Sequence, residues 1–271
     1  MPTGRLRLRV SRGRSGRAAL AIYRPLTARG RLVRLAASMA AALPVSPEPA
    51  DPLIDQLAGL LGMTIDGACG MASSTAGRQI LGLAREGRLV AVAKVGERAD
   101  QGLRREARVL QQLHSIRDIR LPRLILTTDL DDLLVCVTEP LSGRSSRDPA
   151  AGLRAAVALG RAGWTHGDLT PWNLLREPVT VLDWETARHC LLPMYDLSHY
   201  VLQEEAHLGR GDPGTVLWRL CGPGGLGARY LAALGLPLSR APALLRRYLD
   251  EYPLSAGPGR VLRQAVRERF G

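Results

Sequence analysis

Lysine is almost absent from this 271-residue sequence. Of the 37 basic side chains, only one is a lysine, Lys94, and the others are arginines. A single lysine in such a background indicates a position where a compact ammonium group is needed, because the planar guanidinium group of arginine binds its partners differently. Lys94 is therefore the first candidate for a functional residue.

Acidic residues are absent from residues 1–47, which contain ten arginines. The formal charge of +12 thus belongs mainly to this N-terminal arm, since the rest of the chain is nearly neutral. Such an arm can bind an anionic partner, for example nucleic acid, a phospholipid surface or a phosphorylated polymer. Alternatively, it is a solvated or disordered extension. Arginines alternate with apolar residues over residues 5–10, which is typical of a strand with one arginine face.

The sequence also lacks metal-binding cysteine motifs and long apolar runs. The four cysteines show no metal or redox spacing, so we expect reduced thiols. The apolar stretch over residues 35–45 is much shorter than the roughly 20 residues that cross a bilayer. No secretory signal is evident, and we therefore expect a cytoplasmic protein without a transmembrane segment.

The most informative stretch is Trp-Thr-His-Gly-Asp-Leu-Thr-Pro-Trp-Asn-Leu-Leu over residues 164–175, followed by Leu-Asp-Trp-Glu over residues 182–185. Residues 174–176 can form a short strand, and residues 179–182 can return as a second strand after a turn at Glu177-Pro178. A hairpin of this length places Asn173 and Asp183 beside each other at its open end.

Two oxygen donors side by side suit a hard cation such as Mg²⁺, held between the protein and phosphate groups. Asp168 lies five residues before Asn173, in the loop that leads into the hairpin. From there it can face the same metal-bound phosphate and accept a proton from an attacking hydroxyl group. A loop aspartate, an asparagine and a later metal-binding aspartate are the parts that a kinase-like phosphoryl-transfer site requires.

The pattern His-Gly-Asp-x-x-x-x-Asn followed by Leu-Asp-Trp-Glu resembles the aminoglycoside phosphotransferase and choline kinase family. Protein kinases are similar more distantly, since they usually have Arg at the position of Gly167 and Lys at that of Thr170. The resemblance implies that Asp168 is the catalytic residue and that Asn173 and Asp183 bind Mg²⁺. It also implies that His166 braces the loop around the metal-binding aspartate, and that Asp196 ties down the catalytic loop through backbone N–H groups.

Lys94 ends the strand Val-Ala-Val-Ala-Lys, in which alternation places Val90, Val92 and Lys94 on one face. Valines on this face can cover the adenine ring of ATP, and the lysine that follows them can contact its phosphates. The position of Lys94 also matches the family's phosphate-binding lysine. In the helix expected over residues 99–114, Glu106 borders the apolar stripe. A carboxylate there needs a cation, so we expect an ion pair with Lys94. Alternatively, Glu106 is exposed and pairs with a neighbouring arginine.

The remaining nucleotide contacts come mainly from the resemblance. Residues 70–77 form a small-residue turn that would cover the ATP phosphates, with Ser73, Ser74 and Thr75 as candidate contacts. An ordinary hairpin loop would look the same. Residues 138–141 would be the hinge, where backbone groups of Glu139 and Leu141 pair with adenine.

The other elements follow from periodicity and from Gly and Pro breaks. We expect a helix over residues 29–43, a proline-rich linker, and a helix capped by Asp51 that runs to about Leu61. We expect a five-stranded sheet from strands 65–69, 79–84, 89–95, 121–126 and 133–138. Residues 143–148 should form a loop. Helices are expected over residues 149–161, 195–208, 213–234, 239–250 and 257–269. Only 27 positions separate Glu139 from His166, whereas relatives usually fit more helical material there.

These parts predict an α+β, two-lobed, protein kinase-like fold. We expect a basic arm and helix over residues 1–50, a nucleotide-binding N-lobe over 51–138 and a largely helical C-lobe over 139–271. The predicted activity is ATP- and Mg²⁺-dependent transfer of the γ-phosphoryl group to a hydroxyl of a small molecule. The alternative is a pseudokinase or nucleotide-binding regulatory protein whose arm binds an anionic partner.

Overall fold

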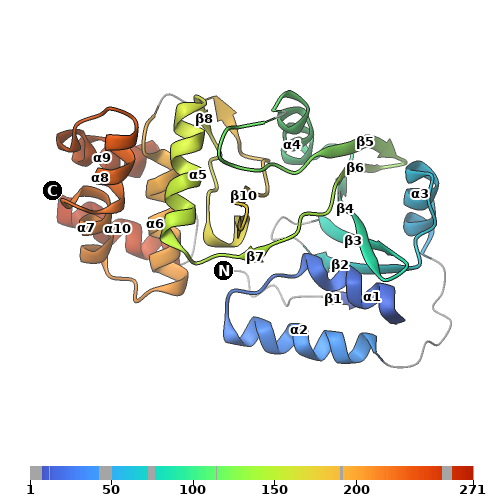
Figure 1. Ribbon diagram of the computed structural model, residues 1–271. Helices are drawn as coiled ribbons and strands as arrows, with labels where there is room; N and C mark the ends of the chain where they lie inside the picture. Colours follow the sequence, from blue (N-terminus) through green and yellow to red (C-terminus); the bar gives the residue numbers. More distant parts are fainter. Residues whose placement is uncertain are drawn as a thin grey trace. The chain divides into compact units, whose positions relative to one another are not determined.

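The computed structural model describes residues 8–11, 13–42, 51–72, 77–113, 115–189, 192–251 and 258–270. The chain divides into two compact units. The sheet unit comprises residues 2–107 and 122–142, and the helical unit comprises residues 108–121 and 143–271. One unit is built on an antiparallel sheet and the other on helices (Figure 1), which confirms the predicted α+β class with a sheet-containing N-terminal part and a largely helical C-terminal part.

The sheet of the sheet unit is antiparallel and has the order β1-β2-β3-β4-β6-β5. Its strands are β1 Leu8–Val10, β2 Gly67–Ala72, β3 Gln79–Arg85, β4 Arg88–Glu97, β5 Leu124–Leu130 and β6 Leu133–Thr138. The five predicted strands are all present, but the predicted strand number is wrong, because β1 from the arginine-rich arm adds a sixth strand. It pairs with β2 and places Val10 opposite Cys69.

The N-terminal segment continues from β1 and packs on the same sheet. It contains α1 Gly13–Ala19, the 3₁₀ helix η1 Leu20–Ile22 and α2 Ala28–Ala41. Ala19 and Leu20 are fully buried against Cys69 and Ala84. A Cβ atom at Gly82 would lie 2.5 Å from the carbonyl oxygen of Ala19, so only glycine allows this close approach. The described residues 8–11 and 13–42 are therefore folded, and the solvated-extension alternative is wrong for them.

Helix α3 Pro52–Leu61 begins as predicted, with the Asp51 carboxylate accepting a hydrogen bond of 3.1 Å from Leu53 N. The proline-rich linker expected before it lies largely outside the described residues. Leu57 of α3 is fully buried in a core that also contains Leu83, Ala93 and Val137. In β4, Ala91, Ala93 and Val95 face this core, so the opposite face carries Val92 and Lys94, as predicted. The same prediction is wrong for Val90, which packs against this core because the pairing of β3 with β4 shifts register between Leu83 and Ala84.

Helix α4 Gln101–Gln112 packs on the other face of the sheet, because Leu103 and Ala107 are buried against Leu134 and Cys136 of β6. Figure 1 shows α4 beside β5 and β6. This packing fixes which side of α4 faces the sheet, and with it the direction of Glu106.

The helical unit contains α5 Pro149–Arg161, α6 Tyr195–Leu208, α7 Pro213–Cys221, α8 Leu226–Ala233, the 3₁₀ helix η3 Leu238–Arg240, α9 Ala241–Glu251 and α10 Pro258–Phe270. The single helix predicted over residues 213–234 is wrong. Gly222-Pro223-Gly224-Gly225 interrupts it, because Pro223 has no N–H group and Gly224 adopts a left-handed φ of +80°. No described helix is long and apolar enough to cross a bilayer.

Short strands lie within and around the stretch over residues 164–185. They are β7 Arg144–Ser145, β8 Trp164–Thr165, β9 Leu174–Arg176, β10 Thr180–Val181 and β11 Arg188–His189, with the 3₁₀ helix η2 Pro171–Asn173 before β9. The predicted hairpin is present as β9 and β10, and β11 pairs with β8. Residues 143–148 were expected to be a loop, but β7 pairs with β9.

Candidate active site

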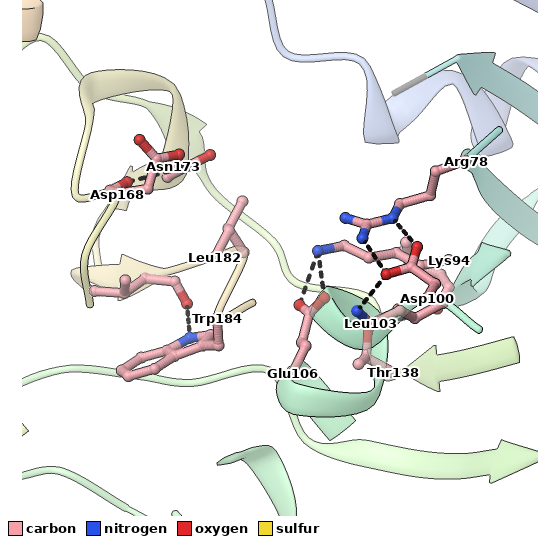
Figure 2. Close-up of polar contacts among 12 residues, drawn as sticks. Arg78, Lys94, Asp100, Leu103, Glu106, Thr138, Asp168, Asn173, Leu182 and Trp184 are labelled. Atoms are coloured by element: carbon pink, nitrogen blue, oxygen red, sulfur yellow. Dashed lines mark hydrogen bonds and ion pairs between the residues drawn. The ribbon is translucent and has the colours of Figure 1, made fainter. Parts of the chain in front are cut away.

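Lys94 and Glu106 form the ion pair that the sequence predicted. Lys94 Nζ lies 2.8 Å from Glu106 Oε1 and 2.7 Å from Oε2, as Figure 2 shows. The Glu106 side chain is 3% exposed and that of Lys94 is 16% exposed. Both charges are thus largely removed from water, and each needs the other.

A second ion pair fixes the start of α4. The Asp100 carboxylate accepts hydrogen bonds of 2.9 Å from Arg78 Nε, 2.7 Å from Arg78 Nη2 and 2.9 Å from Leu103 N. Burial acts to raise the pKa of Asp100, but these hydrogen bonds lower it overall. Arg78 and Asp100 therefore hold the first turn of the helix that carries Glu106 (Figure 2). No pattern in the sequence indicates this pair.

The predicted adenine-binding residues lie on neighbouring strands or just after them. Val92 in β4 is half-buried, on the same face as Lys94, and is paired with Thr138 of β6. Glu139 follows β6; its amide donates to Arg123 O over 2.9 Å, and its carboxylate forms an ion pair with the Arg123 side chain. Ser73, Ser74 and Thr75, predicted to contact phosphates, lie outside the described residues.

Leu141 receives a contact from the N-terminal arm. Arg24, which follows η1, donates a hydrogen bond from Nη2 to the Leu141 carbonyl oxygen. Burial lowers the pKa of Arg24, and the nearby Arg34 adds to this effect. The arm therefore contacts the segment predicted to be the hinge, a contact that no pattern in the sequence indicates.

In the helical unit, Asp168 and Asn173 are brought together. Asn173 Nδ2 donates hydrogen bonds of 3.0 Å to both the Asp168 side-chain Oδ2 and its backbone carbonyl oxygen. Figure 2 shows these two side chains pointing toward each other. Because the amide nitrogen is committed to Asp168, the amide oxygen of Asn173 is the atom that can bind a cation.

The β9–β10 hairpin fixes the position of Asp183. Leu182 N donates to Asn173 O over 2.9 Å, so Leu182 lies directly opposite Asn173 and Asp183 follows it. Asp183 adopts a left-handed φ of +65°, which is uncommon for a residue with a side chain and is often found at functional sites. Trp184 is fully buried, and its indole Nε1 donates to Val181 O over 2.9 Å, which anchors the chain just after Asp183 (Figure 2).

Asp196 ties down the loop that carries Asp168, as the resemblance implies. Its carboxylate accepts hydrogen bonds of 2.9 Å from the backbone N–H groups of His166 and Gly167. Burial raises the pKa of Asp196, and the two N–H groups oppose this effect. Gly167 has a left-handed φ of +84°, and a Cβ atom there would lie 2.9 Å from Thr186 O, so the loop needs glycine where protein kinases usually have Arg.

His166 is fully buried and braces the chain before Asp183. Its ring Nε2 lies 2.9 Å from the carbonyl oxygen of Leu182. The carbonyl oxygen of His166 accepts a hydrogen bond of 2.8 Å from the Thr186 hydroxyl. Asp168, Asn173 and Asp183 therefore belong to one continuous hydrogen-bonded loop system.

His199 is the functional candidate that sequence reasoning missed. It lies in α6 and is fully buried; Nε2 is 3.0 Å from Asp168 Oδ1, and Nδ1 is 3.1 Å from the Tyr248 hydroxyl. A signal existed, because His199 follows Asp196 by three residues and thus shares its helix face. Asp168 keeps a side chain that is 40% exposed, so a buried histidine holds an accessible carboxylate.

The donor set fits Mg²⁺. The Asp183 carboxylate and the Asn173 amide oxygen are hard oxygen ligands, and Mg²⁺ bound through one or two protein groups completes its shell with water and phosphate oxygens. Among the described residues there is no cluster of three or more His, Cys, Asp or Glu side chains that would form an all-protein metal cage.

Comparison with solved structures gives two kinds of neighbour. The aminoglycoside phosphotransferase APH(4)-Ia, in a ternary complex with ADP and hygromycin B, is 12% identical with a TM-score of 0.48, over 81% of this chain and 98% of that one. WbdD, a bifunctional kinase-methyltransferase, is 16% identical with a TM-score of 0.45, over 73% of this chain. This chain spans about half the length of the WbdD chains that it matches. No protein-family model and no curated protein sequence matches it.

Proposed function

We propose that the protein is an ATP-dependent phosphotransferase that moves the γ-phosphoryl group to a hydroxyl of a small molecule, as an aminoglycoside phosphotransferase does. One observation carries the proposal: Asp168 is held by Asn173 and His199 in a loop that Asp196 fixes through two backbone N–H groups. A fixed, partly exposed carboxylate next to a metal-binding amide is what an in-line phosphoryl transfer needs.

Asp168 would orient the acceptor hydroxyl and accept its proton as the bond to phosphorus forms. Each carboxylate oxygen already accepts one hydrogen bond, and each retains a further lone pair for the acceptor. Because Asn173 and His199 fix the carboxylate from two sides, little reorientation is needed when the acceptor arrives. Positioning therefore supplies much of the rate enhancement.

Asn173 and Asp183 would hold Mg²⁺ through the amide oxygen and the carboxylate. When bound, the ion neutralises charge on the β- and γ-phosphates. The hydrogen bonds from Trp184 Nε1 to Val181 O and from Leu182 N to Asn173 O keep the two ligand-bearing segments in register.

Lys94, oriented by Glu106, would bind the α- and β-phosphates of ATP. Val92 would cover the adenine ring, and main-chain groups of Glu139 and Leu141 would pair with its edge. Ser74 and Thr75 would contribute to the phosphate contacts.

The acceptor is proposed to be small. Only about a dozen residues separate Asp183 from the start of α6 at Tyr195, whereas a protein kinase has a long segment there that supports a peptide substrate. We place the reaction in the cytoplasm, where ATP is available.

A second candidate is a nucleotide-binding regulatory protein that transfers no phosphate. The contact of Arg24 with the Leu141 carbonyl oxygen favours it, because this group then has one acceptor site fewer for adenine. The short segment between Glu139 and His166 points the same way, since α5 is its single helix.

The decisive experiment is a thermal-shift titration of the wild type and Asp183→Ala with ATP, with and without Mg²⁺. A ligand that binds only the folded state raises its apparent stability. We expect a Mg²⁺-dependent gain for the wild type alone, followed by transfer of labelled phosphate in a screen of hydroxyl compounds. A Mg²⁺-dependent gain without transfer to any acceptor class would favour the regulatory protein. A folded wild type without any response to ATP would contradict both.

A further inference from the structure

Helix α2 exposes an apolar stripe. Leu32, Leu35 and Met39 are 66%, 58% and 65% exposed. At 100° per residue they lie within about 60° of the helix circumference, so they form one continuous stripe. The opposite side of α2 attaches the helix to the sheet unit, because Ala41 is buried and Ala37 packs against the cluster of Ala19 and Leu20. The stripe therefore faces away from the core of its own unit.

Exposed large apolar side chains are more concentrated in α2 than elsewhere among the described residues. Nine such side chains are exposed in the described part of the chain, and four of them, including Val33, lie within eight residues of α2. Scattered exposed apolar residues are normal, and Val33, which points about 100° away from Leu32, belongs to that kind. The contiguous stripe of Leu32, Leu35 and Met39 is of the kind that marks an interaction surface.

Arginines border the stripe on both edges. Arg29 lies about 60° from Leu32 on one side, and Arg31 about 40° from Leu35 on the other. Both are exposed, and neither forms an ion pair with a described residue. Arg34 is also exposed, but it lies at least about 100° from each residue of the stripe and does not border it. The surrounding residues 1–47 contain no acid that would neutralise them.

We propose that α2 docks on an anionic lipid surface, with Leu32, Leu35 and Met39 inserted among the acyl chains and the arginines on the lipid phosphates. An interfacial helix needs both features in this arrangement, an apolar side and flanking cations. Such docking would hold the protein at a membrane without a transmembrane helix.

The alternatives explain only one of the two features. A second copy of the chain could cover the leucines, but two α2 helices packed stripe to stripe would bring their arginines together. Nucleic acid would satisfy the arginines and leave the leucines and Met39 without a partner, since no aromatic side chain in α2 can stack on bases.

The test is co-sedimentation of the full-length protein with vesicles of phosphatidylcholine alone or with added phosphatidylglycerol. One variant removes the stripe by Leu32→Gln, Leu35→Gln and Met39→Gln, and a second removes the bordering charges by Arg29→Gln and Arg31→Gln. The control carries Leu60→Gln and Val261→Gln, which change exposed apolar residues of α3 and α10. All variants retain the arginines that precede α2, so the charge of that preceding segment is constant.

We expect the wild type and the control to bind vesicles that contain phosphatidylglycerol and not those of phosphatidylcholine alone. Each of the other two variants should lose about tenfold or more in partitioning. ATP binding and melting temperature should stay at the wild-type level, because none of these residues belongs to the proposed site. Wild-type binding by the stripe variant would overturn the proposal, because the arm alone would then account for it. A wild-type dimer that the stripe variant abolishes would overturn the proposal and assign the stripe to a second copy. Binding of RNA by the wild type that both the stripe variant and the charge variant lose would overturn it in favour of nucleic acid.

Discussion

His199 Nε2 lies 3.0 Å from Asp168 Oδ1, and the histidine is fully buried while the aspartate is partly exposed. Tyr248, also fully buried, contacts the other ring nitrogen and thus fixes the ring from behind. A carboxylate that must meet an incoming hydroxyl is in this way held by a group that solvent does not reach. His199 is a positioning residue in the proposed reaction.

His199→Leu should therefore lower kcat for phosphate transfer by roughly 10- to 100-fold, because an imprecisely held base loses part of its effect. KM for ATP should change little, since the ring positions Asp168, which is proposed to meet the acceptor and not the nucleotide. His199→Gln retains a donor at the reach of Nε2 and should recover most of the rate. Equal loss in both variants at unchanged melting temperature would show that the hydrogen bond to Asp168 is not what matters.

The sequence predicts the elements whose signals are local. The β9–β10 hairpin follows from a turn at Glu177-Pro178 between apolar strands, and α3 from a capping aspartate followed by proline. The Lys94–Glu106 ion pair follows from two local periodicities, which place each residue on a definite face of its strand or helix.

What the sequence does not predict depends on partners far along the chain. The alternation that contains β1 is equally compatible with a free arm, and only its pairing with β2, about 60 residues away, makes it part of the sheet. The sequence around His199 indicates only an amphipathic helix, because the contact of His199 with Asp168 depends on how the chain folds. Arg24 and Leu141, which are 117 residues apart, give no sequence signal of their contact.

Asp168→Asn should abolish most phosphate transfer, by about 100- to 10,000-fold, because an amide cannot accept the proton of the acceptor hydroxyl. The change is nearly isosteric, and ATP should raise the melting temperature as much as it does for the wild type. Single-turnover transfer of labelled phosphate and a thermal-shift titration on the same preparation separate the two effects. Rapid transfer by this variant would exclude Asp168 as the base.

The Arg78–Asp100 pair should make stability depend on acid pH. The folded-state pKa of Asp100 is lowered, so its contribution is fully present above the unfolded value of about 3.9 and is lost as pH falls through the folded value. Arg78→Met should destabilise the protein by about 3 kcal/mol at neutral pH, because Arg78 is buried and its partner is left uncompensated. Urea unfolding of both proteins between pH 7 and pH 2 should show this difference shrink in acid. A difference that is constant with pH would assign the effect to packing.

Variants of the Lys94–Glu106 pair should affect the stability of the protein and its nucleotide binding differently. Lys94→Met leaves Glu106, whose side chain is 3% exposed, without its lysine, and should cost about 3 kcal/mol of unfolding free energy. The double variant Lys94→Met and Glu106→Leu should recover most of that loss, because two apolar groups replace two buried charges. Neither variant should show a thermal shift with ATP, since the ammonium group is missing in both. Arg104→Met, which breaks a more exposed ion pair with Asp129, is the control and should cost less than about 1 kcal/mol. A double variant that regains both stability and the response to ATP would remove Lys94 from the nucleotide site.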